Sequence, residues 1–191
     1  MNDLAFYFNE GWQHIISIDA LDHQLFILAL AAVYLIKDWR QVLVLVTAFT
    51  VGHSLTLALS VFDVIRVNST LVEILIPCTI IVTAVFNLFQ KNFNNRSLRF
   101  NYFLALFFGL IHGMGFANTI RFMLAKDQQI GWSLFGFNVG LEAGQLVVVT
   151  TILFLSFIMV NRLQLKRRWW VFSLSSIAAV IAFIILFQRM A

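Results

Sequence analysis

The chain has 191 residues, of which 61% are hydrophobic, and a formal net charge of +4. Soluble domains contain closer to half apolar residues, whereas here the apolar residues form runs that approach the length of about 20 residues needed to cross a bilayer. The basic residues lie in the short segments between these runs. The positive charge therefore indicates membrane orientation and not a nucleic-acid partner.

The first segment, residues 1–20, is too polar to cross a membrane. It combines an apolar run at 4–8 with the acidic residues Asp3, Glu10 and Asp19. We expect it to form a short interfacial or re-entrant helix at the membrane surface.

Six apolar runs follow, and each is predicted to be a transmembrane helix. They show too little alternation for the strands of a membrane barrel, which have about ten residues each. The predicted spans are 22–36, 42–61, 71–90, 100–120, 132–160 and 169–187. The predicted fold class is therefore all-α: a single polytopic transmembrane domain at 1–191, with a six-helix bundle at 22–188 embedded in the lipid bilayer.

The distribution of Lys and Arg predicts the orientation. With the N-terminus outside, nine of the 13 basic residues lie in inner loops and four lie in outer segments. Because cytoplasmic loops carry the excess of Lys and Arg, we predict a multi-pass protein with both termini outside.

The titratable side chains of the spans gather in the outer half of the membrane. His53 lies eight residues from the outer end of its span, about 12 Å deep, and His112 lies at a similar depth. Glu142 lies ten residues below the outer start of its span, about 15 Å deep. The other members of this layer, near the outer surface, are His14, Asp22, His23 and Glu73. Ionisable groups in a membrane are costly, so all of these residues are functional candidates.

Small and polar residues surround these candidates. Ser54, Asn138 and Gln145 are supporting candidates, and the last two share a helix face with Glu142. Glycines at 136, 140 and 144 recur every four residues, and others flank His112. Because such spacing lets helices approach closely, we expect the packing to bring His112 and Glu142 into one site.

Imidazole nitrogens and carboxylate oxygens together suit borderline transition metals such as nickel and zinc. The single cysteine, Cys78, lies inside an apolar segment, so a thiolate site is excluded. We therefore predict a divalent transition-metal site formed by His14, Asp22, His23, His53, His112 and Glu142.

Two uses of such a site remain open. A permeation site binds exchangeable ions and releases them, whereas a catalytic site retains a metal and keeps a position for water. In a catalytic site Glu142 or Asp22 would activate the water. The predicted inner half offers a permeating ion only Asn87 and hydroxyls such as Thr47 and Thr79.

The candidate residues belong to four recognisable sequence motifs, the first of which has two parts, at 11–15 and 21–26. They are GWQHI at 11–15, LDHQLF at 21–26, FTVGHSLTL at 49–57, FGLIHGMGFA at 108–117 and FNVGLEAGQ at 137–145. In this order and spacing they resemble the HupE/UreJ family of hydrogenase and urease accessory membrane proteins. The resemblance implies a small protein of the bacterial inner membrane that acts as a nickel or cobalt permease and supports metalloenzyme maturation. The positions that match are the six predicted ligands.

The first hypothesis is a permease or metal-binding accessory protein for a divalent transition metal, with nickel as the foremost candidate. The alternative is an intramembrane zinc-dependent hydrolase that acts from the periplasmic face. We favour the first hypothesis, in which the protein is not an enzyme. Its expected partners are the metal ion and the bilayer, and we also consider a second copy of the chain or a metalloenzyme-maturation protein.

Overall fold

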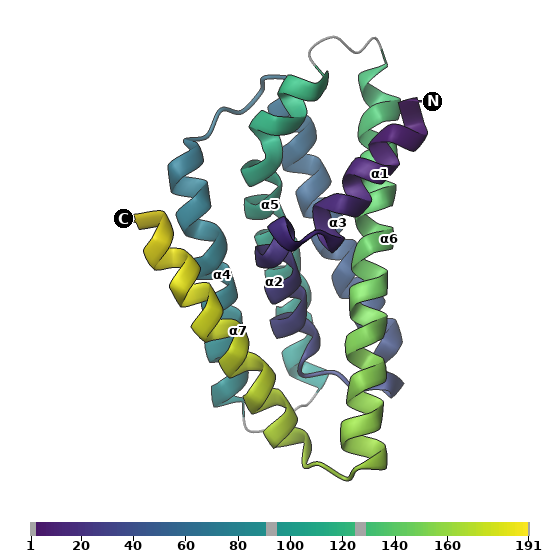
Figure 1. The fold of residues 1–191 in the computed structure, drawn as a ribbon, viewed down its shortest axis with the longest axis vertical. Helices are drawn as coiled ribbons and strands as arrows, with labels where there is room; N and C mark the ends of the chain where they lie inside the picture. Colours follow the sequence, from purple (N-terminus) through teal and green to yellow (C-terminus); the bar gives the residue numbers. More distant parts are fainter. Residues whose placement is uncertain (1–2, 91–94, 125–128, 191) are drawn as a thin grey trace.

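The computed structural model describes residues 3–90, 95–124 and 129–190. Within these ranges the regular structure is helical, which confirms the predicted all-α membrane bundle. The helices are α1 (Asp3–Ile16), α2 (Leu21–Ala31), α3 (Trp39–Val61), α4 (Ser69–Phe89), α5 (Asn95–Leu124), α6 (Ile130–Ser156) and α7 (Arg167–Met190), as drawn in Figure 1. The short elements η1 (Ile18–Ala20), η2 (Ile36–Asp38) and η3 (Phe157–Arg162) join or extend them.

Five of these helices, α3 to α7, are long and apolar enough to cross a membrane. The predicted first span is shorter than expected: α2 ends at Ala31 and has 11 residues, about 16 Å, which is too short to cross alone. A sixth crossing exists if α1 and α2 are counted as one broken span, since they join at a bend of 60°. The division of the chain at residue 20 into an interfacial segment and a bundle stays a prediction.

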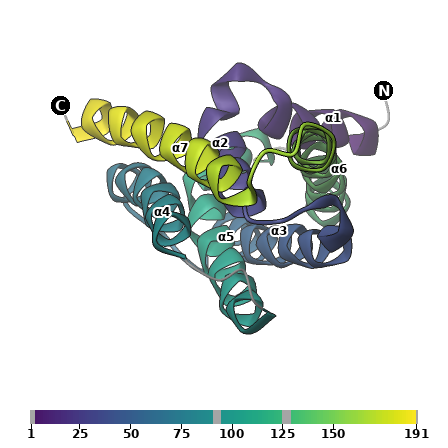
Figure 2. The same ribbon diagram turned by 90° about the horizontal axis from the view of Figure 1, so that it is seen from below.

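The helices are arranged around α2, which packs against α4, α6 and α7. In Figure 2 α2 lies toward the middle, α4 and α7 lie on one side, α1, α3 and α6 lie on the other, and α5 lies between α4 and α3. Large apolar side chains such as Phe154, Val180 and Phe187 remain exposed. Exposed apolar surface of this extent is expected of helices that face lipid. We call the end at which α1, α4 and α6 begin, uppermost in Figure 1, the upper end.

The predicted close packing through glycine is confirmed between α1 and α6. These helices lie side by side and run in the same direction (Figure 1). A Cβ atom at Gly140 would overlap the carbonyl oxygen of Phe8, and one at Gly11 would overlap that of Phe137. Backbone therefore touches backbone, as in other membrane helix pairs with small residues at four-residue spacing. This contact places the end of α1 against the middle of α6.

A second glycine contact joins α3 and α5, which also run in the same direction. A Cβ atom at Gly52 would overlap the carbonyl oxygen of Leu106, and one at Gly109 would overlap that of Phe49. Gly113 lies directly against the backbone of His53. The contact therefore brings the predicted ligands of two different spans, His53 and His112, to the same level of the bundle.

The chain bends between α1 and α2 because Ser17 adopts an extended conformation, with ψ of 158°. A helix end leaves carbonyl groups without partners, and such groups are costly inside a membrane. Gln24 of α2 supplies the missing donor, because its Nε2 donates to the carbonyl oxygens of Ile15, Ile16 and Ser17 at 3.0, 3.2 and 2.9 Å. One side chain thus closes the end of α1 and fixes its position relative to α2.

The lower end of α2 is closed in a similar way. Nδ2 of Asn87, from α4, donates to the carbonyl oxygen of Ala29 at 2.7 Å. Arg167, from α7, donates to the carbonyl oxygen of Val33. The backbone after α2 is irregular but buried, with Tyr34 only 1% exposed, which is the condition under which irregular backbone is tolerated in a membrane.

Candidate metal centre

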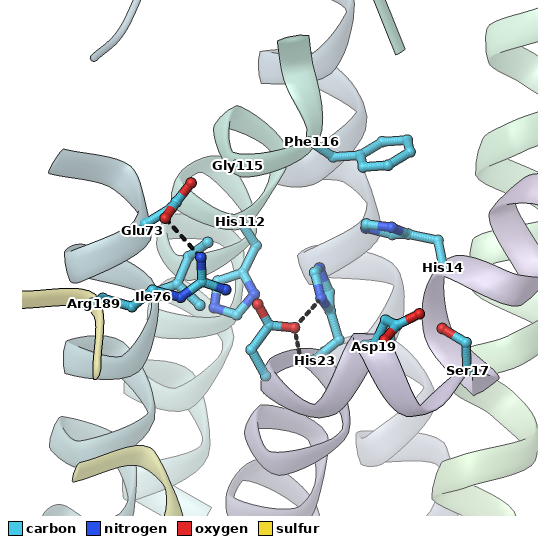
Figure 3. A pocket seen from close by; sticks show the side chains of 12 residues that line it. His14, Ser17, Asp19, His23, Glu73, Ile76, His112, Gly115, Phe116 and Arg189 are labelled. Atoms are coloured by element: carbon cyan, nitrogen blue, oxygen red, sulfur yellow. Dashed lines mark hydrogen bonds and ion pairs between the residues drawn. The ribbon is translucent and has the colours of Figure 1, made fainter. Parts of the chain in front are cut away.

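Three histidines meet where α1 and α2 join. His14 lies at the end of α1, His23 in the first turn of α2 and His53 in the middle of α3. Each offers a ring nitrogen, and the three nitrogens lie within 4.8 Å of one another. The glycine contacts of α1 with α6 and of α3 with α5 hold these rings together. Figure 3 shows His14 and His23 facing each other across the cavity.

The ring nitrogens of this trio are buried and largely without partners. His53 is 0% exposed, and both of its ring nitrogens find no hydrogen bond among the described residues. The same holds for Nε2 of His14 and Nε2 of His23. A buried polar group that is left unpaired costs about 1–3 kcal/mol. Several such atoms at one point are what a site for a bound cation requires.

Asp22 sets the orientation of His23. Its Oδ1 accepts from Nδ1 of His23 at 2.9 Å and from the backbone N–H of the same residue at 2.7 Å. With the proton on Nδ1, the lone pair of Nε2 points into the trio. Carboxylates that bond the far nitrogen of a metal-binding histidine act in this way in many sites. Asp22 therefore supports a ligand.

His112 lies beside the trio. Its ring centre is 4.9 Å from that of His23, and the residue is 0% exposed. Its Nε2 is 3.1 Å from Oγ1 of Thr79, and that hydroxyl donates its single proton to the carbonyl oxygen of Ile76 at 2.7 Å. Nε2 of His112 must therefore be the donor, which leaves the lone pair on Nδ1, an atom without a partner in the described part of the chain. His112 therefore adds a further unpaired ring nitrogen beside the trio.

Aromatic rings surround the histidines. The ring centre of Phe116 lies 4.2 Å from that of His14, and Phe137 stacks against His53 at 6.4 Å. Phe49 packs edge-on against both His23 and His112. These rings restrict the rotation of the imidazoles and keep water out on this side of the site.

The structure does not bring Glu142 to the histidines. Its Oε1 accepts from Oγ1 of Thr47 at 2.8 Å, and Thr47 lies six residues before His53, about 9 Å along α3. The physical reason is the helix period of about 100° per residue. Glu142 lies two positions from both Gly140 and Gly144 and so points away from the face of α6 that contacts α1.

The three supporting candidates make other contacts or none among the described residues. Oε1 of Gln145 accepts from the hydroxyl of Thr50 at 2.8 Å. Ser54 donates to the carbonyl oxygen of Thr50 at 2.6 Å, the common arrangement of a serine in a membrane helix. Oδ1 of Asn138 is buried without a partner among the described residues. None of these three lines the histidine cavity.

A cavity of about 290 Å³ extends from the site toward the upper end of the bundle. The side chains of His14, Asp22, His23 and His112 line it. Its lining also includes Asp19, Glu73 and Arg189, which were not among the predicted site residues. Asp19 could have been found from the sequence, because it lies one turn before Asp22 and His23. The approach of Arg189 has no local signal, because it depends on how α7 packs.

Replacing Gln24 with leucine should weaken metal binding without touching a ligand. The three carbonyl groups at the end of α1 would lose their donor, and His14 would no longer be held opposite His23. We expect the affinity for Ni²⁺ to fall about 10- to 100-fold, as for other residues that orient ligands, when it is measured by titration calorimetry in detergent. Gln13→Leu, on the exposed side of α1, is the control. Wild-type affinity in Gln24→Leu would contradict this role.

Comparison with known protein families matches residues 1–189 to the family described as HupE / UreJ protein. No curated protein and no solved structure matches the chain. The match includes the sequence motifs and all the helices described above apart from the last residue of α7. The chain therefore belongs to the HupE/UreJ family.

Proposed function

We propose that this protein is a permease for a divalent transition-metal ion, with nickel as its first candidate cargo. The observation that carries the proposal is the group of unpaired imidazole nitrogens of His14, His23 and His53 at the break between α1 and α2. Neutral imidazoles bind nickel and zinc well. Three of them, with no carboxylate in the group, form a site from which an ion can leave.

The location of the site supports transport. Membrane transporters commonly bind their substrate near the middle of the bilayer, where a transmembrane helix is interrupted. The break at Ser17 has this character, and the cavity connects it to the upper end. We place that end on the outside of a bacterial inner membrane, with the N-terminus outside.

The histidines are gathered on one side and by themselves offer an ion no route inward. A buried stripe of polar side chains on α4 supplies that route. Thr79, Thr83 and Asn87 follow one another at four-residue intervals on α4, and each is at most 6% exposed. At its upper end Thr79 contacts His112. At its lower end Nδ2 of Asn87 lies 3.2 Å from Oγ of Ser175. Hydroxyl and amide oxygens on this face could accept an ion that leaves His112.

The two carboxylates considered as water activators already make hydrogen bonds to other side chains, which favours the permease over the zinc hydrolase. Asp22 bonds His23, and Glu142 bonds Thr47. A general base needs a carboxylate oxygen within reach of the metal-bound water. The participation of a second copy of the chain or of a maturation protein stays an expectation.

The test is uptake by the full chain reconstituted in liposomes that contain a metal-sensitive dye. We expect Ni²⁺ added outside to enter down its gradient and to be absent from empty liposomes. The metal retained by purified protein is measured by plasma mass spectrometry after mild chelation. One zinc ion per chain that survives chelation, together with no Ni²⁺ flux, would overturn the permease and favour the hydrolase.

Thr83→Val should separate transport from binding. The Thr83 hydroxyl donates to the carbonyl oxygen of Thr79 at 2.8 Å, a bond that the helix does not need, so stability should change little. We expect a slower uptake rate with an unchanged affinity at the histidines. Thr151→Val is the matched control, because that hydroxyl makes the same kind of bond, to Val147, but is exposed on α6. Equal uptake by both variants would exclude the stripe as the route.

A further inference from the structure

An ion pair lies at one side of the histidine cavity, next to His112 (Figure 3). Nη1 of Arg189, in the last turn of α7, lies 2.7 Å from Oε2 of Glu73, near the start of α4. Both side chains are about half exposed, at 49% and 45%, and both line the cavity that contains His23 and His112. In Figure 3 the pair lies across the cavity from His14, on the side nearest His112.

The packing of the bundle does not require this pair. The helices α4 and α7 contact each other along much of their length through other side chains. An ion pair that is half exposed to water contributes little to stability. What distinguishes it from other surface pairs is its position, because both charges line the same cavity as the histidines and an ion on this side of the cavity meets them.

We propose that Glu73 is the first residue to bind the incoming divalent cation and that Arg189 competes with the cation for the Glu73 carboxylate. The inference rests on the permease function proposed above. An ion with two charges gains about twice the Coulomb energy of a monovalent ion at the same carboxylate. It therefore displaces the guanidinium more readily than Na⁺ or K⁺ does, and the pair selects for divalent ions.

The residues between the pair and the histidines support this order of binding. Glu73, Ile76 and Thr79 are spaced three residues apart, so they follow one face of α4 from the ion pair to His112. Gly115 of α5 lies opposite Ile76, and a Cβ atom there would be 2.8 Å from Cδ1 of Ile76. The glycine keeps this part of the cavity open. Glu73 is thus the upper end of the face whose lower part is the polar stripe.

The test compares the direction in which two substitutions change the rate of Ni²⁺ binding to the purified protein. Stopped-flow mixing with Ni²⁺, followed by tryptophan fluorescence, measures how fast the histidines bind the ion. We expect Glu73→Gln to slow binding about fivefold and Arg189→Gln to accelerate it by a similar factor, which is the upper range for an exposed ion pair. The equilibrium affinity should stay unchanged in both, and added NaCl should slow Arg189→Gln more than the wild type.

The controls are Asp63→Asn and Arg66→Gln. Their ion pair, with Nη2 and Oδ2 2.5 Å apart, is also exposed and lies in the connection between α3 and α4, but it does not line the cavity. We expect no change in the binding rate. A change of the same sign in Glu73→Gln and Arg189→Gln would show that the pair only joins α4 to α7 and would overturn the inference. Failure of the wild type to bind Ni²⁺ at all would instead overturn the proposed function.

Discussion

His53→Leu should abolish high-affinity metal binding while leaving the fold intact. Both ring nitrogens of His53 are buried without partners in the described part of the chain, and the residue is 0% exposed. Leucine has a similar volume and removes these unpaired atoms, so the free energy of unfolding without metal should rise by about 1–3 kcal/mol. The affinity for Ni²⁺ should fall by at least about 100-fold, the upper end of the range for residues that only orient ligands.

Thermal unfolding in detergent measures both effects. A ligand at 100 times its dissociation constant stabilises a protein by about 2.7 kcal/mol, and this increment should be lost in His53→Leu. His112→Leu is the comparison, because His112 is equally buried but has Thr79 as a partner for Nε2. We expect it to lose less affinity than His53→Leu. A His53→Leu variant that binds Ni²⁺ like the wild type would show that the trio is not the ligand set.

Gly140→Leu should separate α1 from α6 and so disassemble the site from a distance. The first atom of the new side chain would overlap the carbonyl oxygen of Phe8, and this backbone cannot move without shifting α1. Overpacking of this kind costs about 1–3 kcal/mol and occasionally more. Because His14 lies on the last turn of α1, the affinity for Ni²⁺ should fall together with the free energy of unfolding.

Gly131→Leu is the matched control for this variant. Gly131 lies on the same helix, but a Cβ atom there meets no other atom within 4 Å among the described residues. We expect wild-type stability and metal binding. If Gly140→Leu unfolds less readily than the control or retains full affinity, the contact between α1 and α6 does not position His14.

The membrane fold could be predicted from the sequence because of a strong physical constraint. Every backbone group within a bilayer must find a partner inside the protein, so a long apolar run can be little else than a helix. The helices α3 to α7 follow from this rule. The buried histidines were also recognisable as candidates, since ionisable groups in a membrane are costly unless they have a use.

The details of the N-terminal part could not be predicted in the same way. Residues 3–31 form two helices joined at 60°, and the bend depends on Gln24 reaching back to three carbonyl groups. Composition alone distinguishes a short polar segment from a span, but it does not show which side chain can replace the missing backbone bonds. That replacement is what brings His14 and His23 to the same point.

The sequence by itself determined which helices carry the candidates, and the tertiary structure decided which of them meet. Depth depends on position along a helix, at about 1.5 Å per residue, so His53, His112 and Glu142 were correctly expected to lie within the membrane-spanning helices. Whether side chains meet depends on the rotation of each helix about its axis and on its neighbours. Those are set by the glycine contacts, which turn His53 inward and leave Glu142 bonded to Thr47. Arg189 reaches Glu73 across 116 positions of the chain for the same reason: only the packing of α7 on α4 makes them neighbours.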